Sequence, residues 1–435
     1  MISNESESDS EHESNYETCS DSLSESSSDN IDKTKGDHNL GLLLEGKYIL
    51  INKIGYGTFS TVWLAFMLND LTKKNFYAIK VQHLEDWEDG LKEAQYLNII
   101  KKLECPNLIY MYEWFKYKPK DSKLYHICMV FDVMLSSTYQ VVKKGKYEDG
   151  LEEKIVLQII KQIAIALQSI KTNLSACHLD IKPENILIKN KNNDNQLFSI
   201  KFIEEGFESK FKELCTKIID DNNYKLTNSK HKSKYNLKKN ELCKLLIKEI
   251  NERINESINN ETTNTTEIII DSEISVVLAD FGTLKPFDRI SYKDDIQTRY
   301  YRAPEVILMS GYNEKADIWS LACSAYELLT GSVLFDPEKD KNYSTDFYHI
   351  YWIIELMGDI PKSLITKSKC SSNFFHPTGK FKEKKPLLHS LTDVFDDVSV
   401  SVSSSTIELL NNMLIINPQD RFSYEQIINW IDTKY

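Results

Sequence analysis

Paired cysteines are missing from this sequence: its eight cysteines are scattered, and no two have the two-residue spacing of a zinc or redox motif. This argues against a disulfide-rich secreted scaffold and favours reduced thiols in the cytoplasm or nucleus, of the cell itself or of a host cell. The N-terminus has no apolar core of the secretory type, and we find no apolar run long enough to span a bilayer. We therefore expect an intracellular protein without membrane contact.

Lysine and arginine are absent from residues 1–30, which hold nine Asp or Glu. These acids account for most of the formal charge of −12 and leave about −3 for the rest of the chain. The net charge thus says little about a substrate and does not indicate direct binding to nucleic acid. Residues 1–40 alternate serine with acidic residues, which predicts a disordered tail. The tail is either solubilising or a target of an acidophilic kinase.

Periodicity divides the remaining chain into two lobes. Residues 41–134 form the first, with strands predicted at 48–54, 61–65, 76–81 and 127–131 and a helix at 91–102. Residues 135–188 and 275–435 form a mainly helical second lobe. Between them, residues 189–274 contain no proline and are predicted to be an insertion, with helical spacing at about 198–219 and 237–254. The sequence predicts an α+β, bilobal fold split by a long insertion.

A glycine-containing turn lies between the first two predicted strands. Glycines allow a backbone to approach phosphates closely, and we assign this turn to nucleotide binding. Ser60 stands where a third glycine would complete the usual pattern. Lys80 follows in the next strand and needs a partner if buried, for which we expect Glu93 rather than Glu88. The turn residues assigned to the nucleotide are Ile54, Gly55, Tyr56, Gly57, Thr58, Phe59, Ser60, Thr61 and Val62.

Two further motifs supply the groups that phosphoryl transfer requires. In the motif at 178–185, Asp180 would orient a substrate hydroxyl, Lys182 would contact the transferred phosphate, and Asn185 would bind magnesium. Asp280 begins an Asp-Phe-Gly turn after an apolar strand and would hold a second magnesium against ATP. Thr298 should lie beside Asp180 and Lys182. The predicted reaction is transfer of the ATP γ-phosphate to a hydroxyl.

Other charged residues are predicted to have structural roles. Glu305 of the Ala-Pro-Glu motif should form a buried ion pair with Arg421. Asp317 should support the catalytic loop from below. We interpret His178 as a packing residue behind Phe281 rather than as a base.

Together these motifs resemble the SR-protein kinases, which phosphorylate serines in Arg-Ser repeats. The resemblance implies a serine/threonine protein kinase fold, ATP and Mg²⁺ as cofactors, and a protein substrate, with Arg-Ser-rich proteins as the candidate class. It also implies a monomer. The position of the insertion is similar as well. The matching segments are residues 55–64, 126–133, 180–187, 295–299, 310–313, 316–320 and 353–356.

The family's acidic docking groove for arginine-rich substrates is only partly present. Ser332 and Tyr348 occupy two positions that are acidic in the family, and Glu355 keeps its charge. Asp336 and Asp346 are close enough in sequence to compensate. The kinase groups are therefore better represented than the groove.

Leu179 occupies the position at which most regulated kinases have an arginine that pairs with a phosphorylated activation segment. Leucine cannot form that pair, so we predict activity without phosphorylation between Asp280 and Glu305. Two alternatives stay open. One is a kinase of the wider cyclin-dependent/MAP-type group with targets other than Arg-Ser. The other is a pseudokinase scaffold that binds partners through residues 189–274.

Overall fold

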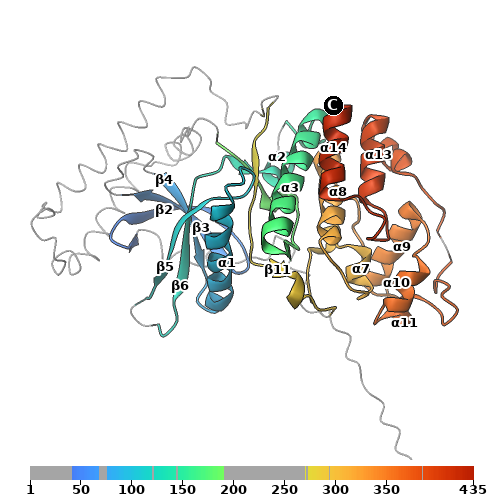
Figure 1. Cartoon of the computed structure of the whole chain (residues 1–435), viewed down its shortest axis with the longest axis horizontal. Helices are drawn as coiled ribbons and strands as arrows, with labels where there is room; N and C mark the ends of the chain where they lie inside the picture. The colour runs from blue at the N-terminus through green and yellow to red at the C-terminus, as the bar shows by residue number, and fades with distance from the viewer. Residues whose placement is uncertain are drawn as a thin grey trace, which may run out of the picture.

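The computed structural model describes residues 42–67, 76–119, 122–143, 146–190, 270, 273–292, 294–384 and 386–435. Within these ranges the chain forms a strand-rich N-terminal lobe and a helical C-terminal lobe (Figure 1), which confirms the predicted bilobal α+β fold. The predicted tail at 1–40 and the predicted helices at 198–219 and 237–254 lie outside the described residues.

A six-stranded antiparallel sheet in the order β1-β2-β3-β4-β6-β5 makes up the N-terminal lobe. The four predicted strands correspond to β2, β3, β4 and β6, whereas β5 was missed because its half-buried residues do not alternate. The helix α1 begins at Trp87, four residues before the predicted start. The elements are β1 (Leu43–Leu44), β2 (Tyr48–Tyr56), β3 (Ser60–Met67), β4 (Phe76–Gln82), α1 (Trp87–Ile100), a 3₁₀ turn (Lys101–Leu103), β5 (Met111–Tyr117) and β6 (His126–Phe131).

Helices dominate the C-terminal lobe, with α3 and α8 at its centre (Figure 1). Its first part contains β7 (Ser136–Ser137), α2 (Thr138–Lys143), α3 (Glu153–Leu174), β8 (Ala176–Cys177), a 3₁₀ turn (Pro183–Asn185) and β9 (Ile186–Ile188). Its second part begins with β10 (Val276–Leu278), β11 (Lys285–Pro286), two 3₁₀ turns (Phe287–Arg289 and Arg299–Tyr301), α7 (Pro304–Ile307) and α8 (Lys315–Thr330). It continues with α9 (Thr345–Met357), α10 (Lys362–Lys367), α11 (Ser371–Phe374), α12 (Leu391–Asp397), α13 (Ser404–Met413) and α14 (Tyr424–Lys434).

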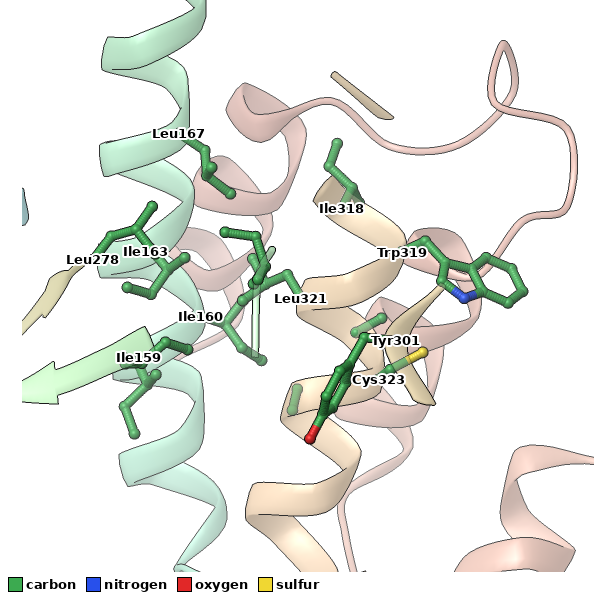
Figure 2. Close-up of a cluster of buried hydrophobic side chains, with 14 of the residues drawn as sticks. Ile159, Ile160, Ile163, Leu167, Leu278, Tyr301, Ile318, Trp319, Leu321 and Cys323 are labelled. Carbon is green, nitrogen blue, oxygen red and sulfur yellow. The ribbon is translucent and has the colours of Figure 1, made fainter. Parts of the chain in front are cut away.

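The helix α3 forms the core of this lobe through an apolar stripe. Ile160, Ile163 and Leu167 are fully or almost fully buried; Ile160 points toward Leu321 of α8, whereas Ile163 lies beside Leu278 (Figure 2). By length and composition α3 could cross a membrane, which corrects the prediction that no such run exists. However, 56% of that window is buried inside the protein, where α3 packs against α8 and α14. Burial of this kind is what the core helix of a folded domain requires.

Strand pairing across the insertion brings distant motifs together. The antiparallel pair β9–β10 sets Leu278 opposite Ile186, and Ala279 N–H donates to the carbonyl of Asn185 at 2.9 Å. Asn185 immediately precedes β9, and Asp280 lies two residues after the end of β10 at Leu278. The two predicted metal ligands therefore lie at the same end of this small sheet, although almost a hundred residues separate them in sequence.

Candidate active site

Lys80 connects the N-terminal and C-terminal lobes, because its ammonium group contacts one carboxylate from each lobe. Its Nζ lies 2.7 Å from both carboxylate oxygens of Glu93 and 3.0 Å from Oδ1 of Asp280. Glu93 is the partner that the sequence predicted, since Glu88 is exposed on α1. The contact also fixes α1, which carries Glu93, relative to the turn that carries Asp280.

The pKa values of this cluster follow from its charges. Burial alone would lower the pKa of Lys80, but the negative charges of Asp280 and Glu93 together raise it above its ordinary value. The same cation lowers the pKa of Asp280 to about 2, although partial burial opposes this shift. Lys80 is therefore a permanent cation and Asp280 a permanent anion near neutral pH. Such charges suit the binding of phosphates and of a hard cation, respectively.

A buried carboxylate under the catalytic loop determines how the loop is placed. Asp317, on α8, accepts hydrogen bonds from the backbone N–H of His178 at 2.9 Å and of Leu179 at 2.7 Å. Leu179 is held with φ of 69° and Asp280 with φ of 63°, the left-handed region, which is uncommon for a bulky side chain such as leucine and more accessible to aspartate. Backbone strain of this kind persists only where surrounding contacts impose it. The predicted support of the loop by Asp317 is confirmed.

Asp180 is enclosed by three polar side chains. Asn185 Nδ2 donates to its Oδ2 at 3.0 Å and to its backbone carbonyl at 2.8 Å, while Lys182 Nζ lies 2.9 Å from Oδ2. The Thr298 hydroxyl donates to Asp180 Oδ1 at 2.8 Å and accepts from Lys182 Nζ at 2.9 Å. The predicted position of Thr298 is confirmed. Asp180 thus has a fixed orientation beside a cation, as a group that orients a hydroxyl requires.

His178 has the packing role that the sequence indicated. It is fully buried, its ring lies edge-on to Phe281 with centroids 5.0 Å apart, and Nε2 is 3.1 Å from the carbonyl of Ala279. Burial lowers the pKa of this imidazole below its ordinary value. A neutral, enclosed ring without access to solvent is a poor candidate for a base.

The glycine turn forms the hairpin between β2 and β3. Gly55 pairs with Val62 and Tyr56 with Thr61, and Gly57 N–H donates to the carbonyl of Ser60 at 2.9 Å. The other turn residues assigned to the nucleotide lie on this same hairpin. Phe59 at its tip is 60% exposed. The hairpin and Lys80 belong to one sheet, because β3 pairs with β4.

Glu305 and Gln297, both polar and buried, anchor the segment that runs from Asp280 to Glu305. Arg421 holds Glu305 through two contacts of 2.8 and 3.0 Å with both side chains fully buried, which confirms that predicted pair. Gln297 received no role from the sequence, yet its N–H donates to the carbonyl of Leu179 at 3.0 Å and its amide bonds to Ser320 at 2.8 Å. A φ of 65° at Gln297 marks this turn, and no local pattern could have signalled it.

The carboxylates around α9 are arranged differently from what the sequence predicted for the acidic docking groove. Asp346 accepts a hydrogen bond from Arg299 Nη1 at 2.6 Å, so its charge is already neutralised within the protein. Tyr348 instead donates to Oδ2 of the exposed Asp340 at 2.9 Å, which places a carboxylate beside that position. Glu355 lines a cavity of about 200 Å³ together with Leu334, Phe335, Trp352, Leu356, His389, Val394 and Asp397.

Two lobes joined by a Lys–Glu–Asp cluster, together with an oriented aspartate and a glycine hairpin, define an ATP-dependent phosphotransferase. A family model described as the protein kinase domain matches residues 48–240 and 264–431. The chain belongs to the protein kinase family. Protein kinases act on ATP and on protein substrates and use a divalent metal ion.

The relatives place the chain within this family. It is 28% identical over 413 residues to the serine/threonine-protein kinase named L205 of Acanthamoeba polyphaga mimivirus, covering 76% of this chain and 75% of that one. It is 29% identical over 360 residues to the serine/threonine-protein kinase SRPK of Physarum polycephalum, with 81% and 77% covered. It is 24% identical over 453 residues to SRSF protein kinase 3 of Mus musculus, with 80% and 79% covered. The chain is a serine/threonine protein kinase, and its predicted resemblance to SR-protein kinases is confirmed as that of a divergent member.

Proposed function

We propose that this kinase transfers the γ-phosphate of Mg²⁺-bound ATP to serines of Arg-Ser-rich proteins and that it needs no phosphorylation of its activation segment. In this proposal Asp180 orients the substrate hydroxyl and Lys182 contacts the transferred phosphate. Lys80 binds the other phosphates and Glu93 holds Lys80 in place. Every group comes from one chain, so a monomer suffices.

The donor set fits magnesium. Because the Asn185 amide nitrogen is bonded to Asp180, the Asn185 amide oxygen remains for a metal ion. Asp280 supplies carboxylate oxygens, of which Oδ1 also receives Lys80. Oxygen donors of this type are the ligands that Mg²⁺ prefers, and a bound Mg²⁺ would neutralise charge on the ATP phosphates. Replacing Asp180 with Asn should abolish turnover and spare ATP binding, and near-normal turnover would contradict the assignment.

The packing of Leu179 is the observation that carries independence from phosphorylation. The side chain of Leu179 is fully buried in an apolar cluster with Cys177, which precedes the catalytic loop, and with Ile296 of the activation segment. Ile290 and Tyr312 also pack against this cluster. Regulated kinases place a cation here, which stays unpaired until a phosphate arrives. The apolar contact of Leu179, by contrast, needs no phosphate, so it supports the activation segment in the unmodified protein.

Phosphatase treatment tests this part of the proposal. We expect purified enzyme to keep its rate after treatment, with mass spectrometry confirming that residues 280–305 carry no phosphate. Loss of most of the activity, restored by rephosphorylation, would refute it.

Peptide preference tests the substrate class. Glu355 in its cavity and Asp340 beside Tyr348 offer negative charge for arginine side chains, which supports Arg-Ser substrates. We expect a peptide of Arg-Ser repeats to be phosphorylated faster than a Ser-Pro peptide, with the difference shrinking in Glu355→Gln. The reverse preference would favour the cyclin-dependent/MAP-type alternative, and no turnover of either peptide would favour a scaffold.

A further inference from the structure

A buried histidine next to the glycine hairpin has no role in the site described above. His83 follows β4 directly and is 6% exposed. Its Nδ1 lies 3.0 Å from the carbonyl oxygen of Thr58, and its Nε2 lies 3.3 Å from Oγ1 of Thr61. Its backbone N–H donates to the carbonyl of Phe59 at 2.8 Å. One residue therefore contacts the hairpin tip at three points.

The partners determine the tautomer of this ring. A carbonyl oxygen can only accept, so Nδ1 of His83 must carry the hydrogen that is donated to Thr58. In the neutral imidazole Nε2 is then an acceptor, and the buried hydroxyl of Thr61 donates to it. Asp86 Oδ2 is 4.0 Å from Nδ1, a distance too long for a direct hydrogen bond. Both ring nitrogens are thus used to hold the hairpin.

These contacts fix the direction of two backbone amides. In a planar trans peptide the N–H points opposite to the C=O of the same unit. Because the carbonyls of Thr58 and Phe59 point at His83, the N–H groups of Phe59 and Ser60 point away from it. Amides that converge from a turn form a site for anions such as phosphate.

We propose that His83 is a positioning residue for ATP: it holds the hairpin tip so that the amides of Phe59 and Ser60 are presented to the nucleotide phosphates. The hairpin carries glycine at 55 and 57, which leaves its tip free to adopt many conformations in the absence of such contacts. A tip that is ordered beforehand binds phosphate more tightly, because less conformational freedom is lost on binding. His83 acts through the backbone and does not itself touch the nucleotide.

A purely structural role for His83 predicts a different outcome. Buried histidines often serve only to satisfy neighbouring polar groups, and their loss then weakens the whole lobe. The two roles are separated by comparing ATP with adenosine, which lacks the phosphates. Positioning of the amides affects ATP alone, whereas a general distortion of the lobe affects both ligands.

The test measures ligand affinities of the full-length chain by calorimetry, for ATP and for adenosine. His83→Phe keeps an aromatic ring but removes both ring hydrogen bonds, and His376→Phe is the matched control because His376 is exposed. We expect His83→Phe to weaken ATP binding and raise the KM for ATP about tenfold, with adenosine affinity and the KM for peptide unchanged. The control should bind ATP as the wild type does.

Milder variants keep the test decisive if His83→Phe fails to fold. His83→Asn retains a donor near the Nδ1 position and should restore most of the ATP affinity. Thr61→Val removes only the hydroxyl that donates to Nε2 and should by itself weaken ATP binding two- to threefold. Equal losses for ATP and adenosine, or unchanged ATP affinity in His83→Phe and Thr61→Val, would overturn the proposal.

Discussion

Replacing Asp317 with Asn should disturb the catalytic loop more than the exchange of one oxygen for an NH₂ group suggests. The carboxylate is fully buried and accepts from two adjacent N–H groups, one on each oxygen. An asparagine has the same shape, but only one of its two terminal atoms can accept. The other, an NH₂ group, would face a backbone N–H, so a donor would meet a donor.

The magnitude follows from these two contacts. Hydrogen bonds to a charged group contribute about 1.5–3 kcal/mol each, and a buried N–H left without a partner costs a similar amount. Burial raises the pKa of Asp317 to about 7, while the two N–H donors favour its ionised form and lower the pKa. Burying the charged carboxylate costs free energy and offsets part of what the two hydrogen bonds contribute. We therefore expect Asp317→Asn to lower the free energy of unfolding by roughly 3 kcal/mol.

Catalysis should fall as well, because the same contacts hold the loop that carries Asp180. A misplacement of 1 Å can cost a factor of about 100 in rate. We expect kcat to fall at least tenfold, while KM for ATP changes little. Urea unfolding and steady-state kinetics measure the two effects, and the exposed Asp396→Asn is the control. Wild-type stability and kcat in Asp317→Asn would refute the reasoning, and reduced stability with normal kcat would refute the link to Asp180.

Three further changes have definite outcomes. In Gly90→Ala the new Cβ would lie 2.7 Å from Cγ of Gln82. We expect α1 to shift and kcat to fall about tenfold, and unchanged kinetics would mean that Gln82 moves instead. Burial lowers the pKa of His349 to about 3, helped by two nearby arginines. The unfolded chain therefore takes up a proton below pH 6.5 that the folded protein refuses, and stability falls by up to about 1.4 kcal/mol per pH unit as the pH drops. His349→Leu should flatten unfolding midpoints between pH 6.5 and 5, and an unchanged slope would contradict this. Glu305→Gln leaves the Arg421 guanidinium buried without a counter-charge and should cost about 3–5 kcal/mol. In urea unfolding the double variant Glu305→Leu/Arg421→Met should recover part of that loss, and greater destabilisation than Glu305→Gln would argue against the charge explanation.

Sequence reasoning succeeded where one residue type requires another. A lysine in a buried strand needs a carboxylate, and Glu93 was the one on the correct helical face. A carboxylate in the Ala-Pro-Glu motif needs a cation, which identified Arg421. In both cases the burial of a charge without a partner is costly enough to exclude most alternatives.

Contacts made to backbone carbonyls could not be predicted from the sequence in the same way. His83 binds the carbonyls of a hairpin that is more than twenty residues earlier, and Gln297 binds the carbonyl of Leu179 across the insertion. Backbone carbonyls occur at every residue, so they give a side chain no identifiable partner in the sequence. The strand β5 was missed for a related reason: it is held by backbone pairing to β6, and its side chains lack the alternation of a half-buried strand.

The activation segment illustrates how these backbone contacts bear on regulation. Gln297 ties the segment to the catalytic loop and to α8, and Arg299 ties it to Asp346 of α9. Leu179 and Ile296 add an apolar contact between the same two loops. Each of these contacts is made by unmodified side chains, so phosphorylation of the segment would have little left to stabilise. If the proposed independence from phosphorylation holds, target selection rests on how substrates bind, and the carboxylate of Glu355 is where we expect that selection to be measurable.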